Sequence, residues 1–421
     1  MPSAIQEART LIKDIKAANV APTDKSRLLY VNKLNQRKIQ NREAAWLLRN
    51  PDFGLSPLVS DMQQSPVIGK GTYRMLKAGP IATRHVKPFT AKELRDLVSP
   101  DPAYRMDAKQ YIIDEMIDSE RRINDTMEFI AHCAIARGRV RYILNDAIGR
   151  MDVNLSFPVK TQDAAATWAN IATDIVSQMD TYIKAFINRA GKRPDTIRMT
   201  STTWEYVKAN TAVKAVFGSY IRTQGVKVSE IPVGMITPEL VAKALDWPPI
   251  AIYDERTQVK YAVTNSEAEG NNVTVELTGG TWGISVGDKA LCDYKMADAG
   301  YDDWDFEATV ETVTPGVSIV IDIPSGKSLT AGEYIAVKPT FFPEQKVVLI
   351  ADEFVDNEFI LVPFGIEYSG SEIAANMWFG PRMDIFNIGQ EPGMGVARRN
   401  WHEFGMMLGN PNKIMSVQII V

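Results

Sequence analysis

Side chains that could act as an acid, a base or a nucleophile near neutral pH are sparse in this chain of 421 residues. It has three histidines, His85, His132 and His402, and two cysteines, Cys133 and Cys292. His132 adjoins Cys133 within a predicted helix, where consecutive side chains point about 100° apart and cannot work as a pair. We predict no G-x-S-x-G nucleophile motif, and no H-E-x-x-H or paired C-x-x-C motif accompanies them. We therefore predict a structural role for His132 and a chain that is not an enzyme.

Two short motifs resemble ligand sites but lack the spacing that the chemistry needs. Residues 69–72 (GKGT) look like part of a phosphate loop, but the G-x-x-x-x-G-K-[ST] frame is missing, and we interpret them as a turn. The densest acidic cluster is Asp302, Asp303, Asp305 and Glu307. The glycine and the distal glutamate that a calcium loop places at set positions are absent from it. We predict a solvated acidic loop there, no metal site and no cofactor.

Charge is distributed unevenly along the chain. Residues 1–100 carry 17 lysines and arginines against 8 aspartates and glutamates, a net +9, whereas residues 265–343 carry 4 against 13, a net −9. One end of the molecule could therefore face an anion while another faces solvent, the alternative being an ordinary fluctuation of charge. The basic side chains of a predicted N-terminal helix are Arg27, Lys33, Arg37, Lys38 and Arg42.

The elements that position these residues begin with two predicted helices. The first covers Ser3–Ala18, and the second runs from a cap near Thr23 to Arg49, where Asn50-Pro51 ends it.

An extended hairpin is predicted next. Two β-prone pieces, Thr72–Leu76 and Ile81–Val86, flank Gly79-Pro80 in a stretch punctuated by proline and glycine. Few residues between 51 and 90 could form a core of their own, so this stretch must pack on the rest of the chain or on another copy. The candidate contact residues of this stretch are basic: Lys70, Arg74, Lys77 and Arg84.

The best-defined element is a long helix between Asp101-Pro102 and Gly138. Asp101 supplies an N-cap, the proline takes the first helical position, and Gly138 is placed to end the helix. About 36 residues lie between them, on the order of 54 Å at 1.5 Å per residue. The apolar face is predicted to hold Ile113, Met116, Ile117, Ile123, Met127, Ile130 and Ala134. The opposite, polar face is predicted to hold Asp114, Asp118, Arg121, Arg122, Asp125 and Glu128.

After the long helix, helix and strand patterns alternate, which indicates a mixed α+β domain. The predicted strands are Val153–Val159, Thr196–Met199, Ile250–Tyr253 and Lys260–Val263. The predicted helices are Thr167–Ala190, Thr203–Ala209 and Pro238–Leu245.

Residues 265–343 change character, because strand patterns separated by turn residues replace helical periodicity. The predicted strands are Asn272–Leu277, Lys289–Tyr294, Phe306–Thr314, Ser318–Ile323 and Tyr334–Lys338. Five short strands in about 75 residues indicate a small β-barrel or sandwich. The mixed pattern resumes at Val347–Ile350, so we interpret this β-module as an insertion into a loop.

Length and composition argue against a membrane-spanning protein, an exported protein and a fold built on disulfides. The length is enough for two or three packed units. No run of about 18 apolar residues exists that could span a membrane, and the first twenty residues lack an apolar signal core. Two cysteines are too few for a fold built on disulfides, which favours a reducing compartment.

The order of these patterns resembles the Hong Kong 97-like fold of tailed-phage major capsid proteins, in the branch around the lambda capsid protein E. The similar stretches are VKPFTAKELRDL with IIDEMIDSERRINDTMEFIAHCAIARGRV, RPDTIRMTSTTWEYVKANTAVKAVF, and NWHEFGMMLGNPNKIMSVQII. They are similar, in turn, to the family's lead-in strand and spine helix, its strand–helix segment and its closing strand. Together they cover most of residues 81–263 and 344–421.

The resemblance implies a division of the chain. It implies a helical basic N-terminal arm (1–50), an extended loop (51–100), a peripheral domain with the spine helix (101–160 and 380–421), an axial domain (161–264 and 344–379) and an inserted β-module (265–343). The basic arm would lie on the inner face of a shell, the extended loop with Lys70, Arg74, Lys77 and Arg84 would reach another subunit, and the acidic β-module would face outward.

It also implies a function with no chemical step. Copies would assemble into pentamers and hexamers of an icosahedral phage head that encloses double-stranded DNA, bound without sequence preference. Scaffold, portal and decoration proteins would be further partners. The protein would be part of the virion, after assembly in the host cytoplasm.

Two other functions fit parts of the sequence. One is an encapsulin-like shell of a bacterial compartment, which has the same Hong Kong 97-like fold and encloses an enzyme cargo. Encapsulins, however, lack a long basic arm and usually have no large insertion in this fold. A sugar-binding or host-binding β-module on an unrelated scaffold would make residues 265–343 the functional unit. That hypothesis leaves the long helix and the extended loop unexplained.

Overall fold

The computed structural model describes most of the chain as three hydrophobic cores linked by long strands. The described residues are 28–38, 44–49, 73–78, 81–88, 91–146, 149–223, 236–256, 259–269, 271–277, 284, 286–296, 302–314, 317–331, 333–337, 340–342, 346–355, 357–361, 367–369, 372–374, 382–387 and 396–419.

The second predicted N-terminal helix is wrong at most of those of its residues that the structure describes. Its described part is a short helix, α2 (Leu29–Lys33), followed by two strands, β1 (Asn35–Lys38) and β2 (Ala44–Arg49). β1 pairs in parallel with β17 (Asn357–Leu361), from Asn35 opposite Glu358 to Lys38 opposite Leu361. This distant pairing satisfies the backbone of residues with fair helix propensity and overrides that propensity. The first predicted helix lies outside the described residues.

The predicted hairpin is also wrong, because its two strands pair with other strands. The two strands exist, as β3 (Tyr73–Ala78) and β4 (Ile81–Pro88), but they do not pair with each other. β3 pairs antiparallel with β2, and β4 pairs antiparallel with β21 (Val396–Leu408). Sequence periodicity identifies a strand but gives no information on a partner more than 300 residues away.

The long helix is confirmed. It is α4 (Pro102–Arg137), and the Asp101 side chain accepts a hydrogen bond from the Ala103 backbone N–H at 2.9 Å. Gly138 ends the helix in the left-handed conformation, with φ of +64°. A Cβ atom there would lie 3.1 Å from the Phe157 carbonyl oxygen and 3.2 Å from Val159 Cβ, so only glycine fits without a shift.

Burial along α4 is uneven. All side chains from Met127 to Ala136 are buried, whereas most of the first turns of the helix are exposed. The predicted apolar positions Ile123, Met127, Ile130 and Ala134 do lie in the core. The predicted polar face is wrong at Glu128, which is fully buried. The first half is also preceded by a helix that periodicity did not indicate, α3 (Ala91–Leu97).

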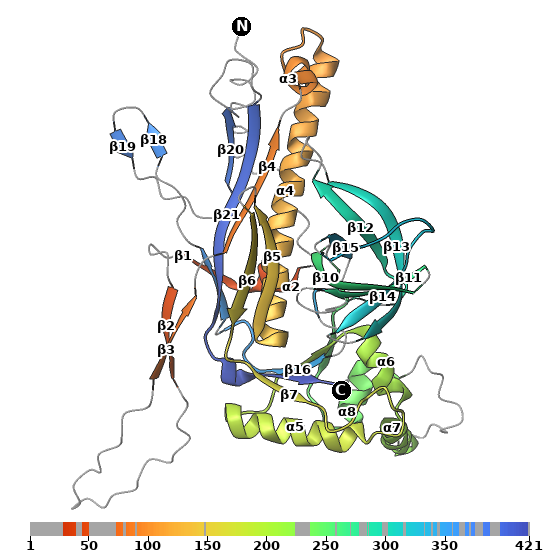
Figure 1. Ribbon diagram of the computed structural model, residues 1–421. Helices are drawn as coiled ribbons and strands as arrows, with labels where there is room; N and C mark the ends of the chain where they lie inside the picture. Colours follow the sequence, from red (N-terminus) through yellow and green to blue (C-terminus); the bar gives the residue numbers. More distant parts are fainter. Residues whose placement is uncertain are drawn as a thin grey trace, which may run out of the picture.

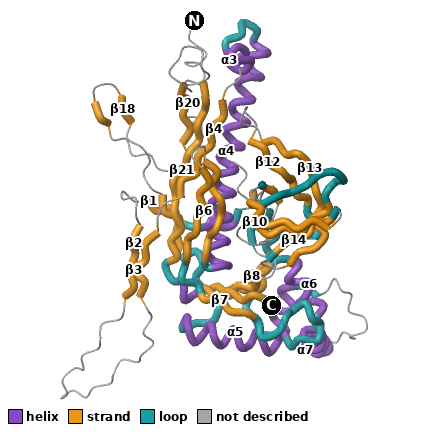
Figure 2. The backbone as a smooth tube through the Cα atoms, in the orientation of Figure 1, coloured by secondary structure: helices purple, strands orange, loops and turns teal. Residues whose placement is uncertain are grey.

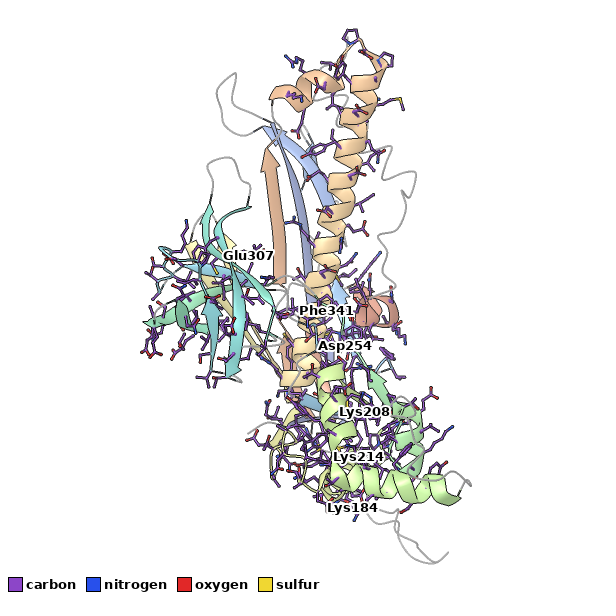
Figure 3. The ribbon with its side chains drawn as sticks, turned by 90° about the vertical axis from the view of Figure 1, so that its right-hand side faces the viewer. Lys184, Lys208, Lys214, Asp254, Glu307 and Phe341 are labelled. Carbon is purple, nitrogen blue, oxygen red and sulfur yellow. The ribbon has the colours of Figure 1, made fainter. Side chains whose placement is uncertain are left out.

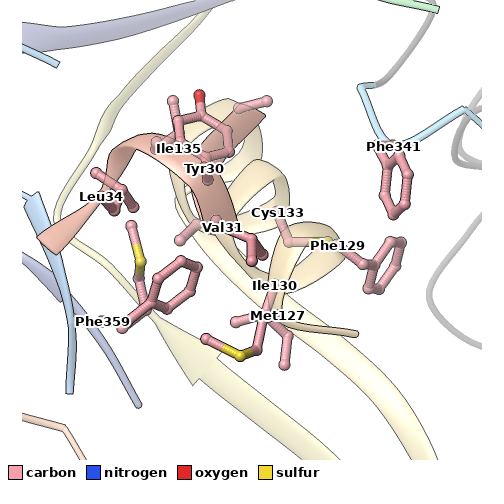
Figure 4. Packing of buried hydrophobic residues seen from close by; sticks show 14 of the residues in the cluster. Tyr30, Val31, Leu34, Met127, Phe129, Ile130, Cys133, Ile135, Phe341 and Phe359 are labelled. Carbon is pink, nitrogen blue, oxygen red and sulfur yellow. The ribbon is translucent and has the colours of Figure 1, made fainter. Parts of the chain in front are cut away.

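The first core, which we call the spine core, packs around the second half of α4. Figure 4 shows Tyr30 and Val31 of α2, and Leu34 just after it, lying beside α4, which carries Met127 and Ile130. A five-stranded sheet covers the core further. Its order is β1-β17-β21-β20, with β20 spanning Arg382–Asn387 and β4 on the other edge of β21.

The second core lies beneath a sheet of order β7-β22-β16-β8-β9. Its strands are β7 (Lys160–Asp163), β22 (Ile414–Gln418), β16 (Lys346–Ile350), β8 (Thr196–Met199) and β9 (Ile250–Ile252). Its helices are α5 (Ile175–Ala190), α6 (Ser201–Ala209), α7 (Thr211–Thr223) and α8 (Pro238–Ala244), and a short 3-10 helix, η3 (Pro411–Lys413), precedes β22. Figure 2 gathers these helices at one end of the molecule, opposite α3 and the start of α4.

Several predictions for this unit are confirmed and two need correction. The strand Thr196–Met199 has the predicted bounds, and Gly191 ends α5 with φ of +73°. α5 begins at Ile175, not Thr167, because Asp174 caps it by accepting from the Ser177 backbone N–H. The helix α7 was missed.

The third core fills a closed six-stranded barrel of order β10-β11-β14-β13-β12-β15. The strands are β10 (Val259–Glu269), β11 (Asn272–Leu277), β12 (Lys289–Met296), β13 (Asp302–Thr314), β14 (Ser318–Asp322) and β15 (Tyr334–Val337). β10 begins before residue 265 and includes Lys260–Val263, which we had predicted as a strand of the surrounding domain. The acidic cluster that begins at Asp302 lies in strand β13, not in the predicted loop.

Three pairs of strands stand apart from these sheets. Within the described residues, β2 pairs only with β3, β5 (Arg139–Asp146) only with β6 (Gly149–Ser156), and β18 (Glu367–Ser369) only with β19 (Glu372–Ala374). Figure 1 shows β2–β3 and β18–β19 projecting to one side of the molecule. A pair of strands is marginally stable in water unless something packs against it.

Candidate functional site

The described residues contain no group of three or more histidine, cysteine, aspartate or glutamate side chains arranged to hold a metal ion. None of the described helices is long and apolar enough to cross a membrane. Both cysteines are buried, and burial raises the pKa of the Cys133 thiol well above its usual range. The buried polar groups instead cluster around α4. We call this cluster the polar junction, and it consists of Tyr30, Glu128, His132, Arg198, Tyr253 and Glu353.

Glu128 lies at the centre of the polar junction. Its carboxylate accepts backbone hydrogen bonds from Leu29 at 2.9 Å, from Tyr30 at 2.9 Å and from Val31 at 3.0 Å. These are N–H groups of the first turn of α2, and Leu28 provides no side-chain cap for it. Glu128 therefore caps a helix that lies almost 100 residues earlier in the chain, which fixes α2 on α4.

His132 lies one helical turn after Glu128 and is fully buried. Its Nε2 atom is 3.0 Å from Glu128 Oε1. The imidazole ring stacks on Tyr253 at a centroid distance of 4.7 Å and meets the edge of Tyr30 at 4.6 Å. Since Nδ1 has no hydrogen-bond partner, the geometry fits a neutral ring that donates from Nε2 to Glu128.

An ion pair forms the other half of the polar junction. Arg198 of β8 donates from Nη2 to Glu353 Oε2 at 2.7 Å, and its Nη1 contacts both Glu353 Oε1 and the Tyr30 hydroxyl. The Tyr30 hydroxyl in turn donates to Glu353 Oε1 at 2.5 Å. The pair is almost completely buried, so its charges depend on each other and on Tyr30 for compensation.

The pKa values follow from this arrangement. Burial alone would raise the pKa of Glu128, but the hydrogen bond from His132 and those from Val31 and Tyr30 outweigh it and lower the pKa. Burial lowers the pKa of His132, and the nearby Glu128 opposes this only in part. Burial also raises the pKa of Tyr253. Glu128 is therefore ionised and His132 neutral at pH 7.

The polar junction is suited to holding elements together. The side chains of Glu128 and His132 are 0% exposed, so a substrate cannot reach them. Apart from the Glu128–His132 contact within α4, these polar contacts join elements distant in sequence: α2 to α4, α2 to β8, and α4 to the segment after β9. The structural role predicted for His132 is confirmed. The sequence carried one overlooked signal, the i, i+4 spacing of Glu128 and His132.

Three of the five predicted arm residues can be placed. Lys33 ends α2, and Arg37 and Lys38 lie on β1, all with exposed side chains. Lys33 Nζ lies 5.0 Å from the centre of the Phe354 ring, and Arg37 approaches Glu358 at 4.0 Å. These three cations therefore follow one short segment, although not on the predicted helix.

The remaining predicted residues are placed less fully. Arg27, Arg42 and Lys70 lie outside the described residues. Arg74 and Lys77 lie on β3, opposite Leu48 and Ala45, and Arg84 lies on β4 opposite Trp401.

Apolar side chains are exposed at the start of the long helix. Tyr104 is 59% exposed and Met106 is 70% exposed, and Val98, in the link from α3, is also exposed. Figure 1 shows this corner of α3 and α4 at the end of the molecule farthest from α5. Large apolar side chains at such a site favour a contact with another molecule.

The prediction of no G-x-S-x-G motif is wrong, since residues 283–287 (GISVG) match it. A serine nucleophile of this type needs a strand, a tight turn and then a helix. Here the next element is strand β12, which starts at Lys289, and the described residues of the match, Ile284, Val286 and Gly287, precede it without a helix. The surroundings of a nucleophile elbow are therefore missing.

Comparisons with known proteins found similarity only at the level of structure. No family model and no curated protein matches the chain. A protein assigned as the capsid protein of a prophage of E. coli CFT073 is 12% identical, with a TM-score of 0.42 and 98% of each chain covered.

Two further solved structures show a weaker likeness. The capsid of Myoviridae phage XM1 is 7% identical, with a TM-score of 0.38, and the match covers 90% of this chain and 85% of that one. A virus-like particle from Pyrococcus furiosus is 8% identical, with a TM-score of 0.32, and the match covers 97% and 96%. Since all three TM-scores lie below 0.5, these matches do not themselves establish a function.

Proposed function

We propose that this chain is a structural subunit that assembles with copies of itself into a closed shell, as the major capsid protein of a tailed phage. Its fold would be the Hong Kong 97-like fold, in the branch around the lambda capsid protein E. The sequence stretches that resemble this family support the proposal. So does the mixed helix and sheet architecture around one helix of 36 residues.

The observation that carries the proposal is the exposed start of α4. Residues that are apolar and exposed, Tyr104 and Met106, lie on a helix that is buried from Met127 to Ala136. A helix gains most of its stability from packing an apolar face, whereas these two apolar side chains on its first turns stay exposed. Contact with a neighbouring copy would bury these side chains.

The strand pairs β2–β3, β5–β6 and β18–β19 support the same conclusion. Each is a pair without a third strand among the described residues. Strand pairs of this size need packing from outside to be stable. In a shell, the segment of residues 51–100 would lie over an adjacent subunit, where Arg74, Lys77 and Arg84 would meet its surface.

The proposed division of labour follows the resemblance. Residues 161–264 and 344–379 would form the axial domain at the centre of pentamers and hexamers. Residues 101–160 and 380–421 would form the peripheral domain. The barrel would face outward, where its acidic surface would remain solvated.

The basic N-terminal segment, residues 1–50, would face packaged double-stranded DNA. Lys33, Arg37 and Lys38 are exposed on one short segment, which suits contact with phosphates. Binding of this kind would be independent of base sequence and would weaken as salt rises. Scaffold, portal and decoration proteins would be the other partners. The protein would be a virion component, assembled in the host cytoplasm and without enzymatic activity.

Expression of the chain alone tests the assembly claim. Sedimentation velocity and negative-stain electron microscopy should show rings of five or six copies or closed shells. A species that stays monomeric at high protein concentration would contradict the proposal.

The contents of purified particles separate the phage head from the alternative, an encapsulin-like shell. Mature phage particles should contain double-stranded DNA and no enzyme cargo. Particles that carry an enzyme and no DNA would favour the encapsulin-like shell.

A further inference from the structure

The N-terminal segment and the barrel meet at the same two side chains of α4. We call residues 28–38 the strap, since they cross the second half of α4. We call residues 253–256 and 340–342 the barrel stem, since they connect the barrel to the rest of the chain. Although more than 200 residues apart in sequence, the strap and the barrel stem both contact Glu128 and His132.

The strap depends on Glu128 for its attachment. Three backbone N–H groups of the strap, those of Leu29, Tyr30 and Val31, donate to the Glu128 carboxylate. The Tyr30 ring packs edge-on against His132. Apolar side chains of the strap complete the contact, and Figure 4 shows Val31 and Leu34 pointing into the spine core.

The barrel stem uses the same two residues. The Tyr253 hydroxyl donates to Glu128 Oε1 at 3.2 Å, and its ring stacks on His132. Phe341 stacks on the imidazole as well, at a centroid distance of 6.0 Å. The two halves of the barrel stem are joined, since the Phe341 backbone N–H donates to the Glu255 carbonyl at 2.8 Å.

Figure 3 shows where the barrel stem lies in the molecule. Phe341 and Asp254 are close together, beside the barrel that carries Glu307 and above the helices that carry Lys208 and Lys214. A loosening of the barrel stem would therefore change how firmly the barrel is held on the body.

We propose that the strap and the barrel stem are energetically coupled through Glu128 and His132, so that releasing one loosens the other. The physical reason is that they share one buried carboxylate. If the strap leaves, Glu128 loses three of its hydrogen-bond donors and becomes a poorly compensated buried charge. Water must then reach it, and the Tyr253 hydroxyl bond and the stack on His132 are disturbed. A molecule that binds the strap and pulls it from α4 would thereby loosen the attachment of the barrel.

Hydrogen exchange of the full-length chain, followed by mass spectrometry with residue resolution, tests this coupling. The substitution Glu128→Gln removes the charge and one of the two acceptor oxygens. Exchange at the amides of Leu29 to Val31 should become at least tenfold faster. The Phe341 amide in the barrel stem should accelerate with them, although its own hydrogen-bond partner is unchanged.

A second variant tests the coupling from the other side and perturbs the fold less. Tyr253→Phe removes the hydroxyl, which donates to Glu128 and also contacts the Leu29 backbone N–H, and it keeps the ring on His132. The strap amides that report the coupling in this variant are therefore those of Tyr30 and Val31. Because coupling between two sites is reciprocal, the strap amides should exchange faster in this variant too. Asp118→Asn is the matched control on the same helix, since Asp118 is exposed and pairs with Arg122 only at the surface.

Two results would overturn the proposal. In the first, Tyr253→Phe leaves the exchange rates of the strap amides unchanged, so that strap and stem are independent. In the second, exchange accelerates equally in α5, whose core is separate from the polar junction. The effect would then be a global loss of stability and not a local coupling.

Discussion

Glu128 lies in the middle of a helix, yet its side chain is fully buried and caps a different helix. The cost of burying a carboxylate is met by three backbone N–H groups, the Tyr253 hydroxyl and His132. Its neighbour His132 is neutral because burial outweighs the attraction of the carboxylate. At the residue scale, the fold therefore depends on an ionised Glu128 and a neutral His132, and the burial of both side chains determines these protonation states.

Stability should consequently fall on acidification. Since the pKa of His132 is lowered from 6.5 in the folded chain, the unfolded chain binds a proton first as the pH falls below about 6.5. The free energy of unfolding then decreases, by at most about 1.4 kcal/mol per pH unit for one proton. The lowered pKa of Glu128 acts in the same direction below its ordinary value of 4.5.

Urea denaturation between pH 7 and pH 5 measures the histidine contribution. The variant His132→Gln, which does not titrate, should show a shallower decrease than the natural chain. Equal slopes in the two proteins would show that His132 titrates alike in the folded and unfolded states, contrary to the account.

Gly138 offers a test of local backbone geometry. Gly138→Ala should lower the free energy of unfolding by more than the 1–2 kcal/mol, roughly, that a left-handed conformation costs a residue with a side chain. The excess arises because the new methyl group would lie 3.1 Å from the Phe157 carbonyl oxygen.

Gly326→Ala is the control for this substitution. Its φ is +83°, but no atom lies within 4 Å of the added methyl group. Chemical denaturation measures the free energy of unfolding of both variants. If the two substitutions lower it equally, the crowding at Gly138 has no energetic effect.

At the scale of elements, the sequence predicts helix ends that depend on neighbouring residues, but not strand partners that lie far away in the chain. The caps and length of α4 follow from Asp101, Pro102 and Gly138, which act on neighbouring backbone groups. The error at residues 35–38 arose because β1 takes its partner from β17, which lies more than 300 residues away, and the error at 44–49 arose because β2 pairs with β3. Glu128 was assigned to solvent for the same reason, since its donors come from the distant strap.

The barrel is the element that should separate most readily from the rest. It has its own core, and its two connections are held together where Arg256 pairs with Thr340. A two-residue turn such as Asn-Gly can join paired antiparallel residues. Replacing residues 257–339 with such a turn should leave a chain that still unfolds cooperatively.

Circular dichroism during thermal unfolding checks this expectation. The shortened chain should lose the signal of the barrel strands and keep that of α4 and α5. A product that is aggregated or without a cooperative transition would show that the barrel is required for the remaining fold.

At the scale of the whole molecule, the exposed corner of α3 and α4 matters most. Met106→Gln should leave the stability of the isolated subunit within about 0.5 kcal/mol, because surface substitutions rarely do more. It should nevertheless reduce assembly measured by sedimentation velocity. Ile123→Gln is the contrast on the same helix, since Ile123 is buried and its loss should unfold the subunit. If Met106→Gln assembles at the same protein concentrations as the natural chain, this corner is not a contact between copies.

The central claim is that copies of this chain form a shell in which the first half of α4 is covered by a neighbour. Cryo-electron microscopy of particles formed by the full chain tests it most directly. The account predicts rings of five and six subunits with Tyr104 and Met106 buried between copies. Particles in which both side chains stay exposed to solvent, or a chain that forms no particles, would contradict it.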